Sequence, residues 1–250
     1  MKPPTHGPPD PHCPKCHGIG AVTVERDGVF RRERCDCAIK NSVKKSWENW
    51  VPGCDWENPS IDAIEKLNWE NLSIDEHNHT AIEKLSGLMY DPLSGARGAL
   101  LKGQPGRGKT WIAAATLRGM AVEKPFPTSQ YIFWDEFLDD AHEIKMSEHP
   151  NLGKLFETWI RKPKLLLIDN VGIDTSFNEA KSTNFGRKLF LRVLEERTRI
   201  MGSITLFTTE FRDLSDWRGY ALPSAISRLT GLCQTIGIFE LKGEDRRIQL

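Results

Sequence analysis

The sequence contains no long hydrophobic run, and this absence limits where the protein can reside. No apolar stretch approaches the roughly 20 residues that a membrane-spanning helix needs. The N-terminus, Met-Lys-Pro-Pro-Thr-His, lacks the apolar core of a signal peptide. We therefore expect a cytoplasmic protein with no membrane partner. Because thiols stay reduced in the cytosol, its clustered cysteines indicate a metal site rather than disulfides.

An excess of charge of one sign is also missing. The chain has 34 Lys and Arg residues against 34 Asp and Glu residues. Any nucleic-acid binding must therefore come from a local patch and not from the field of the whole molecule. One basic patch with aromatic neighbours is present, made of Arg31, Arg32, Arg34, Lys40, Lys44, Lys45, Trp47 and Trp50. This patch suits single-stranded nucleic acid or an acidic partner, and equally the solvated face of a helix.

A glycine-rich turn at residues 103–110 is the most informative stretch of the chain. Its sequence, Gly-Gln-Pro-Gly-Arg-Gly-Lys-Thr, matches the pattern G-x-x-x-x-G-K-[ST] in full. The apolar run Ala99–Leu101 precedes the turn, and an Ala-rich apolar helix follows it. Glycines let backbone N–H groups converge on a polyphosphate, and the helix N-terminus adds partial positive charge. The turn therefore predicts a binding site for ATP.

The residue types in this turn suggest individual roles. Lys109 would reach the β- and γ-phosphates, and the Thr110 hydroxyl would ligate Mg²⁺. We expect the turn and the first residue after it to bind the nucleotide. The predicted contacts are Gly103, Gln104, Pro105, Gly106, Arg107, Gly108, Lys109, Thr110 and Trp111.

A second apolar run, Leu165–Ile168, ends in Asp169 and Asn170. A run without alternation is typical of a parallel strand buried on both faces. Its end would place the Asp169 carboxylate near the Mg²⁺ of a bound nucleotide. ATP-hydrolysing members of the additional-strand P-loop class usually have Glu or Asp next, whereas Asn170 can orient a water but cannot take its proton. We therefore predict firm ATP binding and slow hydrolysis.

The end of a third apolar strand, Ile204–Thr208, supplies further candidates. Thr208 and Thr209 stand where AAA+ proteins have a polar sensor of the γ-phosphate, and Glu210 stands where Asn is more usual. Two interpretations of Glu210 remain open. It could supply the base that Asn170 lacks, or it could be a surface residue that starts the next loop.

Two arginines late in the chain complete the set of candidates. Arg228 lies on a short apolar helix after Pro223. Taken alone, such an arginine is more often part of a surface ion pair, but its place after the third strand favours a guanidinium that binds a γ-phosphate across a subunit boundary. Arg247 follows Gly243-Glu-Asp-Arg246 and would touch the nucleotide or a partner.

Four of the six cysteines form two pairs near the N-terminus, Cys13 with Cys16 and Cys35 with Cys37. A strand–turn–strand pattern with Asp27-Gly28 at the turn would bring the pairs together. This arrangement predicts a four-thiolate Zn²⁺ site. The second pair has a single intervening residue, fewer than is usual, so His12 or His17 could replace one cysteine. A module of roughly forty residues with little apolar content needs such a metal to fold.

From Gly98 onward, strands alternate with helices, which predicts an α/β domain with a parallel sheet covered on both faces. The expected strands are Gly98–Leu101, Gln130–Trp134, Leu165–Ile168, Ile204–Thr208 and Thr235–Leu241. The expected helices are Lys109–Val122, Asp135–Met146, Leu152–Arg161, Glu179–Thr198 and Pro223–Leu232. We expect a Cys-rich zinc-binding module at 1–45, a linker at 46–68 and an ATP-binding domain at 69–250.

A partial repeat crosses the boundary between linker and domain. Residues 56–67 recur, with a five-residue insertion, within residues 69–85. Two copies are too few for a solenoid, so a local duplication is the preferred interpretation. The second copy would supply a helix beside the strand that precedes the glycine-rich turn.

Together these motifs resemble the DnaC/DnaI-type replicative helicase loaders, close relatives of the IstB transposition helper ATPases. The shared stretches are Cys-Pro-x-Cys-x-Gly-x-Gly with a later Cys-x-Cys, Trp69-Glu-Asn, the turn at 100–110, Leu-Leu-Ile-Asp-Asn-Val-Gly at 166–172, Phe-Thr-Thr, Ser-Arg-Leu at 227–229 and Gly-x-Asp-x-Arg at 243–247. The chain departs from the family pattern at Asn170, at Glu210 and in the duplicated segment.

The resemblance implies an AAA+ P-loop NTPase with a parallel sheet flanked by helices, preceded by a small zinc-binding module. It implies a weak ATPase that self-assembles through ATP, Arg228 of one protomer completing the site of its neighbour. The N-terminal module would bind a DnaB-family replicative helicase, and the AAA+ domains would contact single-stranded DNA.

Three other functions compete with the loader. An IstB-type helper would bind DNA and recruit a transposase. A small-molecule kinase would need an Arg-rich lid, which the sequence lacks. The last alternative is a zinc-module adaptor that binds no nucleotide.

Overall fold

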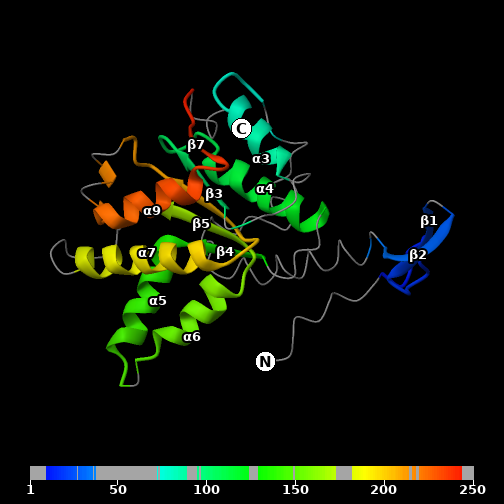
Figure 1. Ribbon diagram of the computed structural model, residues 1–250, viewed down its shortest axis with the longest axis horizontal. Helices are drawn as coiled ribbons and strands as arrows, with labels where there is room; N and C mark the ends of the chain where they lie inside the picture. Colours follow the sequence, from blue (N-terminus) through cyan, green and yellow to red (C-terminus); the bar gives the residue numbers. More distant parts are fainter. Residues whose placement is uncertain are drawn as a thin grey trace.

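A computed structural model gives the structure of the chain (Figure 1). It describes residues 10–26, 28–35, 37, 72, 74–88, 95, 97–123, 129–148, 150–172, 182–213, 216–217 and 220–243. The expected linker at 46–68, most of the basic patch and Arg247 lie outside the described residues.

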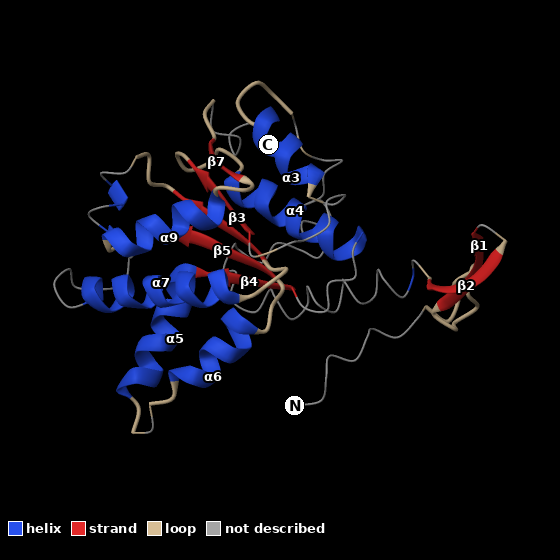
Figure 2. Ribbon diagram, viewed as in Figure 1, coloured by secondary structure: helices blue, strands red, loops and turns tan. Residues whose placement is uncertain are grey.

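The sheet of the larger part has five strands in the order β4-β5-β6-β3-β7 (Figure 2). These strands are β3 (Arg97–Lys102), β4 (Ser129–Phe133), β5 (Leu165–Val171), β6 (Ile204–Thr209) and β7 (Gly237–Glu240). Every neighbouring pair is parallel. The carboxyl ends of β3, β5 and β6 therefore meet at one edge, where open α/β sheets bind ligands. The expected parallel α/β fold is confirmed.

Helices cover both faces of the sheet (Figure 1). One face carries α3 (His79–Gly87) and α4 (Lys109–Glu123), and the other carries α5, α6, η2, α7 and α9. The bounds of the second group are α5 (Trp134–Met146), α6 (Leu152–Phe156), η2 (Glu157–Arg161), α7 (Ser182–Arg199) and α9 (Pro223–Cys233). Within the described part of the chain, no helix has the length and apolar character needed to cross a membrane.

The observed elements differ from the expected ones mainly at their ends. Trp134 was expected to end a strand, but it begins α5 and is fully buried among aromatic rings of the second face. The expected helix Leu152–Arg161 is α6 continued by the wider helical turn η2. The last strand is shorter than expected, with its described bounds at Gly237–Glu240.

Helix α3 contains the end of the second repeat copy. The loop before it is closed by side-chain hydrogen bonds, since Asp75 accepts from the backbone N–H of His77 and Asn78, and Asn78 accepts from the N–H of Asp75. The buried face of α3 packs in one cluster with α4 and β3. The second copy therefore supplies a helix, as predicted; its main neighbours are α4 and β7, and β3 belongs to the same apolar cluster.

A buried arginine joins α7 to the sheet. Arg197 is fully buried, and its guanidinium donates to the Thr205 hydroxyl on β6. Its remaining hydrogen bonds go to backbone carbonyls before β5 and in β6, those of Ile160, Pro163, Lys164 and Ile204. Burial lowers the pKa of Arg197 below its ordinary value.

The N-terminal module is an antiparallel hairpin of β1 (Ala21–Arg26) and β2 (Val29–Arg34). Arg26 pairs with Val29, and Gly28 lies in the turn of the hairpin. Gly28 has a φ of 74°, which a glycine adopts without strain. The expected strand–turn–strand is thus present.

Candidate nucleotide-binding site and cysteine cluster

The glycine-rich turn connects β3 to α4 at the carboxyl edge of the sheet. Gly103, Gly106 and Gly108 all have positive φ, at 141°, 75° and 79°. A Cβ on Gly103 would lie 2.4 Å from the carbonyl oxygen of Leu241, so no larger residue fits there. These backbone conformations shape a turn whose N–H groups can face an anion.

Lys109, the first residue of α4, is almost fully buried, with 7% of its surface exposed. Its Nζ donates to the carbonyls of Gly103 and Gln104, both at 2.8 Å. The ammonium is therefore held across the turn, close to where the loop amides converge.

Asp169 is the centre of a cluster of hydroxyl groups and is only 2% exposed. Thr110 Oγ1 donates to both carboxylate oxygens, at 2.9 and 3.2 Å. Tyr131 donates to Oδ2 at 2.8 Å, and Thr208 donates to Oδ1. Burial raises the pKa of the Asp169 carboxyl above its ordinary value, and the three hydroxyl donors and the charge of Lys109 oppose this rise.

Asn170 lies at an irregularity where β5 and β6 change register, between Ile168 and Val171. Its φ is 65°, a left-handed conformation in which Asn and Asp are the most frequent residues after Gly. Its N–H donates to Thr208 Oγ1 at 2.8 Å. This left-handed backbone conformation favours Asn at position 170 even without a role of its side chain in ATP hydrolysis.

The two threonines at the end of β6 have different surroundings. Thr208 is hydrogen-bonded to Asp169, whereas Thr209 donates to the carbonyl of Val171 at 2.7 Å and accepts from the N–H of Phe211. The structure thus brings Thr208 to the site, and Thr209 ties the strand ends together. Half-buried Glu210 follows, and no hydrogen bond within the described ranges joins it to Asp169.

The segment after β6 reaches back to the glycine-rich turn, a contact that the sequence did not indicate. The Gln104 side-chain amide faces the Arg212 guanidinium, and its oxygen is assigned as the acceptor because a guanidinium can only donate. Lys102 Nζ donates to the carbonyl of Arg212 and lies 3.4 Å from Glu240 Oε2. Arg212 thereby links the β6 end to the turn.

The residues at this edge fit ATP with Mg²⁺. Among the described residues, Arg107 Nη1 and Trp111 Nε1 are buried donors without a hydrogen-bond partner. The Thr110 hydroxyl and the Asp169 carboxylate are the hard oxygen ligands that Mg²⁺ prefers. The turn, Lys109 and these ligands come together as the sequence pattern requires.

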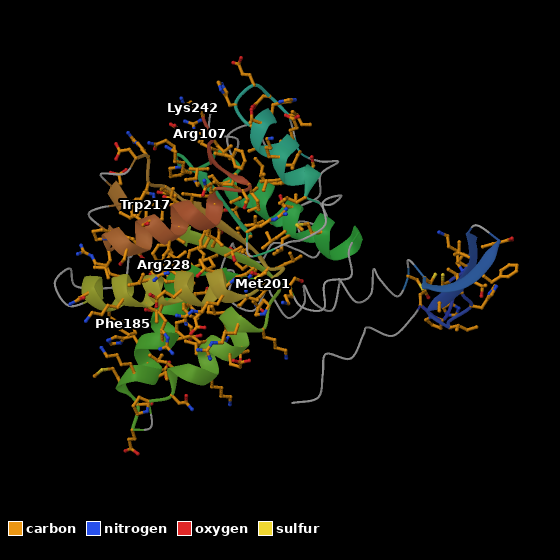
Figure 3. All side chains as sticks on the ribbon, in the orientation of Figure 1. Arg107, Phe185, Met201, Trp217, Arg228 and Lys242 are labelled. Carbon is orange, nitrogen blue, oxygen red and sulfur yellow. The ribbon has the colours of Figure 1, made fainter. Side chains whose placement is uncertain are left out.

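Arg228 lies on α9, away from these hydrogen bonds. Its Nη2 is 3.1 Å from Glu195 Oε1 on α7, and 45% of its side chain is exposed. Figure 3 labels it between the two helices. The structure shows the ion pair, and it leaves part of the guanidinium accessible to a neighbouring molecule.

The four N-terminal cysteines form one compact group. The sulfur atoms of Cys13, Cys16, Cys35 and Cys37 all lie within 4.8 Å of one another. The backbone N–H of Gly20 donates to Cys16 Sγ at 3.3 Å, the type of contact that orients a metal ligand. His12 and His17 are exposed and outside the group. Four soft thiolates at this spacing fit Zn²⁺.

No protein-family model and no curated protein sequence matches the chain. Solved structures match its fold. AMPPCP-bound DnaA from Aquifex aeolicus gives a TM-score of 0.56 at 18% identity, over 73% of this chain and 52% of that one. The chain therefore spans about half the length of this DnaA.

Two further structures are covered over nearly their whole length. DnaI gives a TM-score of 0.56 at 18% identity, over 75% of this chain and 94% of DnaI. The DnaC helicase loader gives 0.57 at 15% identity, over 72% of this chain and 98% of DnaC. The chain thus has the fold of these proteins, a parallel sheet flanked by helices with a glycine-rich turn after β3, and a cysteine cluster in its N-terminal module.

Proposed function

We propose that this protein is an ATP-dependent loader that binds a DnaB-type replicative helicase and places it on single-stranded DNA. The main observation in support is the coverage of solved structures: 98% of the DnaC helicase loader and 94% of DnaI, against 52% of DnaA. In this proposal, residues 69–250 are an ATPase domain of loader size, and the cysteine module precedes it.

In this proposal the loop amides and Lys109 bind the phosphates, and Thr110 and Asp169 hold the Mg²⁺. Gln104, Arg107 and Trp111 border the nucleotide. Bound Mg-ATP supplies the charged γ-phosphate at which protomers are joined. Asn170 orients water without removing its proton, so turnover is slow.

Arg228 would complete the site of a neighbouring protomer in an ATP-joined oligomer. The ion pair between Arg228 and Glu195 must break before the guanidinium can bind a phosphate. Breaking an exposed ion pair costs only about 1 kcal/mol or less. Arg228→Ala is expected to abolish ATP-dependent self-association in sedimentation experiments. Normal association of this variant would exclude the arginine-finger role.

The zinc-loaded four-cysteine module would contact the helicase. Nucleotide would shift the population toward the assembled state by binding it more tightly than the free chain. The ATP state would thereby control helicase binding, DNA entry and release.

Copurification with a DnaB-family helicase tests the proposal. We expect capture in the presence of ATP, loss of capture in Cys13→Ser and normal capture in the control His12→Ala, which changes an exposed neighbour. Equal capture by the parent and by Cys13→Ser, or no capture in any nucleotide state, would refute the proposal. Preferential binding to duplex DNA would indicate the IstB-type function instead.

A further inference from the structure

Tyr131 is a member of the Asp169 cluster that lies on a different strand from every residue predicted for the site. It is on β4, where it pairs in register with Leu167, and Phe133 pairs with Asp169. Tyr131 and Asp169 are therefore diagonal neighbours on the same face of adjacent strands. A long aromatic side chain can span this separation.

The two parts of the Tyr131 side chain have different surroundings. The half-buried ring packs against the apolar cluster formed with α4, β3 and β5. The hydroxyl donates to Asp169 Oδ2 at 2.8 Å. This division suits tyrosine, whose ring prefers an apolar contact and whose hydroxyl needs a polar partner.

The donors around Asp169 act on different oxygens. Thr208 donates to Oδ1 and Tyr131 donates to Oδ2. Together they fix the plane of the carboxylate from both sides, while Thr110 lies within hydrogen-bond distance of both oxygens. Removal of the phenolic hydroxyl would leave Oδ2 with Thr110 alone among these donors.

We infer that Tyr131 is a positioning residue for metal-dependent nucleotide binding, because it holds the Asp169 carboxylate in the orientation needed for a Mg²⁺ ion shared with Thr110. This inference rests on the proposed nucleotide site and assigns a further residue to it. Hydrogen-bond partners of metal ligands commonly change metal affinity by about 10–100-fold when removed.

Calorimetric binding of AMPPCP at increasing Mg²⁺ concentration tests the inference. In Tyr131→Phe, the Mg²⁺ concentration for half-maximal binding should rise about tenfold. Binding of AMPPCP in EDTA should stay at the parental value, since the loop and Lys109 are unchanged. The matched control is Tyr220→Phe, which removes the hydroxyl that accepts a hydrogen bond from Trp134 Nε1 in the aromatic cluster on the other face. This control should behave like the parent.

A double-mutant cycle separates positioning from a structural role. In an Asp169→Asn background, Tyr131→Phe should cause no further change, because its effect passes through the carboxylate. A parental Mg²⁺ dependence in Tyr131→Phe, or an equal loss of binding with and without Mg²⁺, would overturn this inference alone. Absence of AMPPCP binding by the parent would overturn the proposed nucleotide site and this inference with it.

Discussion

Asp169 combines almost complete burial with three hydroxyl donors, so its ionised form is stabilised by hydrogen bonds but penalised by loss of water. The net effect is a raised pKa. The folded state therefore holds a proton here more tightly than the unfolded state. The resulting stabilisation is fully present below about pH 4, the ordinary Asp value, and is lost as the pH rises through the folded-state pKa.

The first prediction follows from the upward shift of the Asp169 pKa in the folded state. Without Mg²⁺ at pH 7, Asp169→Asn should increase the free energy of unfolding by about 1 kcal/mol. The gain should disappear below about pH 4, where the parental carboxyl is protonated in both states. Urea unfolding at the two pH values measures the difference. A variant that is less stable than the parent at pH 7 would show that hydrogen bonding outweighs burial.

The second prediction concerns hydrolysis at Asn170. Because this residue has a φ of 65°, Asp is the substitution that adds a carboxylate with little backbone strain. Asn170→Asp should raise the rate of phosphate release at saturating Mg-ATP by about 100-fold, by supplying a base. Asn170→Glu should also gain activity but should lose about 1 kcal/mol of stability through strain. Unchanged turnover in both variants, with ATP binding intact, would mean that Asn170 does not limit hydrolysis.

The proximity of the glycine-rich turn to the Lys109 ammonium could be predicted from sequence, because one short motif fixes the spacing of these residues. The contacts made by Tyr131, Thr208 and Arg212 depend instead on strand order and register. The regular pairing of Leu167 with Leu206 puts Asp169 opposite Thr208 on one face of the sheet, whereas Thr209 is on the other face. This register depends on which strand lies beside β5, and no local pattern in β5 specifies that neighbour.

At the level of elements, α7 is attached to the sheet by Arg197. Near the end of a helix, arginine usually indicates a solvated residue that complements the helix dipole, so its burial could not be inferred from position alone. The fixed fork of the guanidinium has five donors. It connects α7 to the chain before β5 and to β6, and it satisfies buried carbonyls of both.

The third prediction tests this connection. Arg197→Met should lower the free energy of unfolding by about 3 kcal/mol, because several buried carbonyls lose their donor. Arg199→Met is the matched control on the same helix, since Arg199 is exposed. It should change stability by no more than about 0.5 kcal/mol. Equal effects of the two substitutions in urea unfolding would show that Arg197 is not a structural connection.

For the whole molecule, the parallel sheet was predictable because its buried strands lack alternation and its helices occur between them. The cysteine module was predictable in outline for a different reason, the spacing of its thiols. Sequence spacing could not decide whether His12 or His17 replaces one cysteine as a metal ligand. The answer depends on where the hairpin places the second cysteine pair relative to Cys13. In the structure, four sulfurs meet and both histidines stay exposed.

The fourth prediction follows from the apolar core of the cysteine module, which shares no residue with the clusters that flank the five-stranded sheet. In the described module, the buried core consists of Cys13, Cys16 and Cys35, with Val22 and Cys37 packed against it. None of these residues belongs to the two clusters that flank the five-stranded sheet. Removal of metal should therefore unfold the module and leave the part with the five-stranded sheet folded.

This prediction requires three measurements on the full chain. Metal analysis should find one zinc per chain, and a strong chelator or Cys16→Ser should remove it together with helicase capture. AMPPCP binding and the main thermal transition should remain at their parental values, because the P-loop and its supporting strands have their own core. A fall in nucleotide affinity on chelation would mean that the two parts fold as one unit. Full helicase capture by the metal-free protein would mean that the module is not the contact.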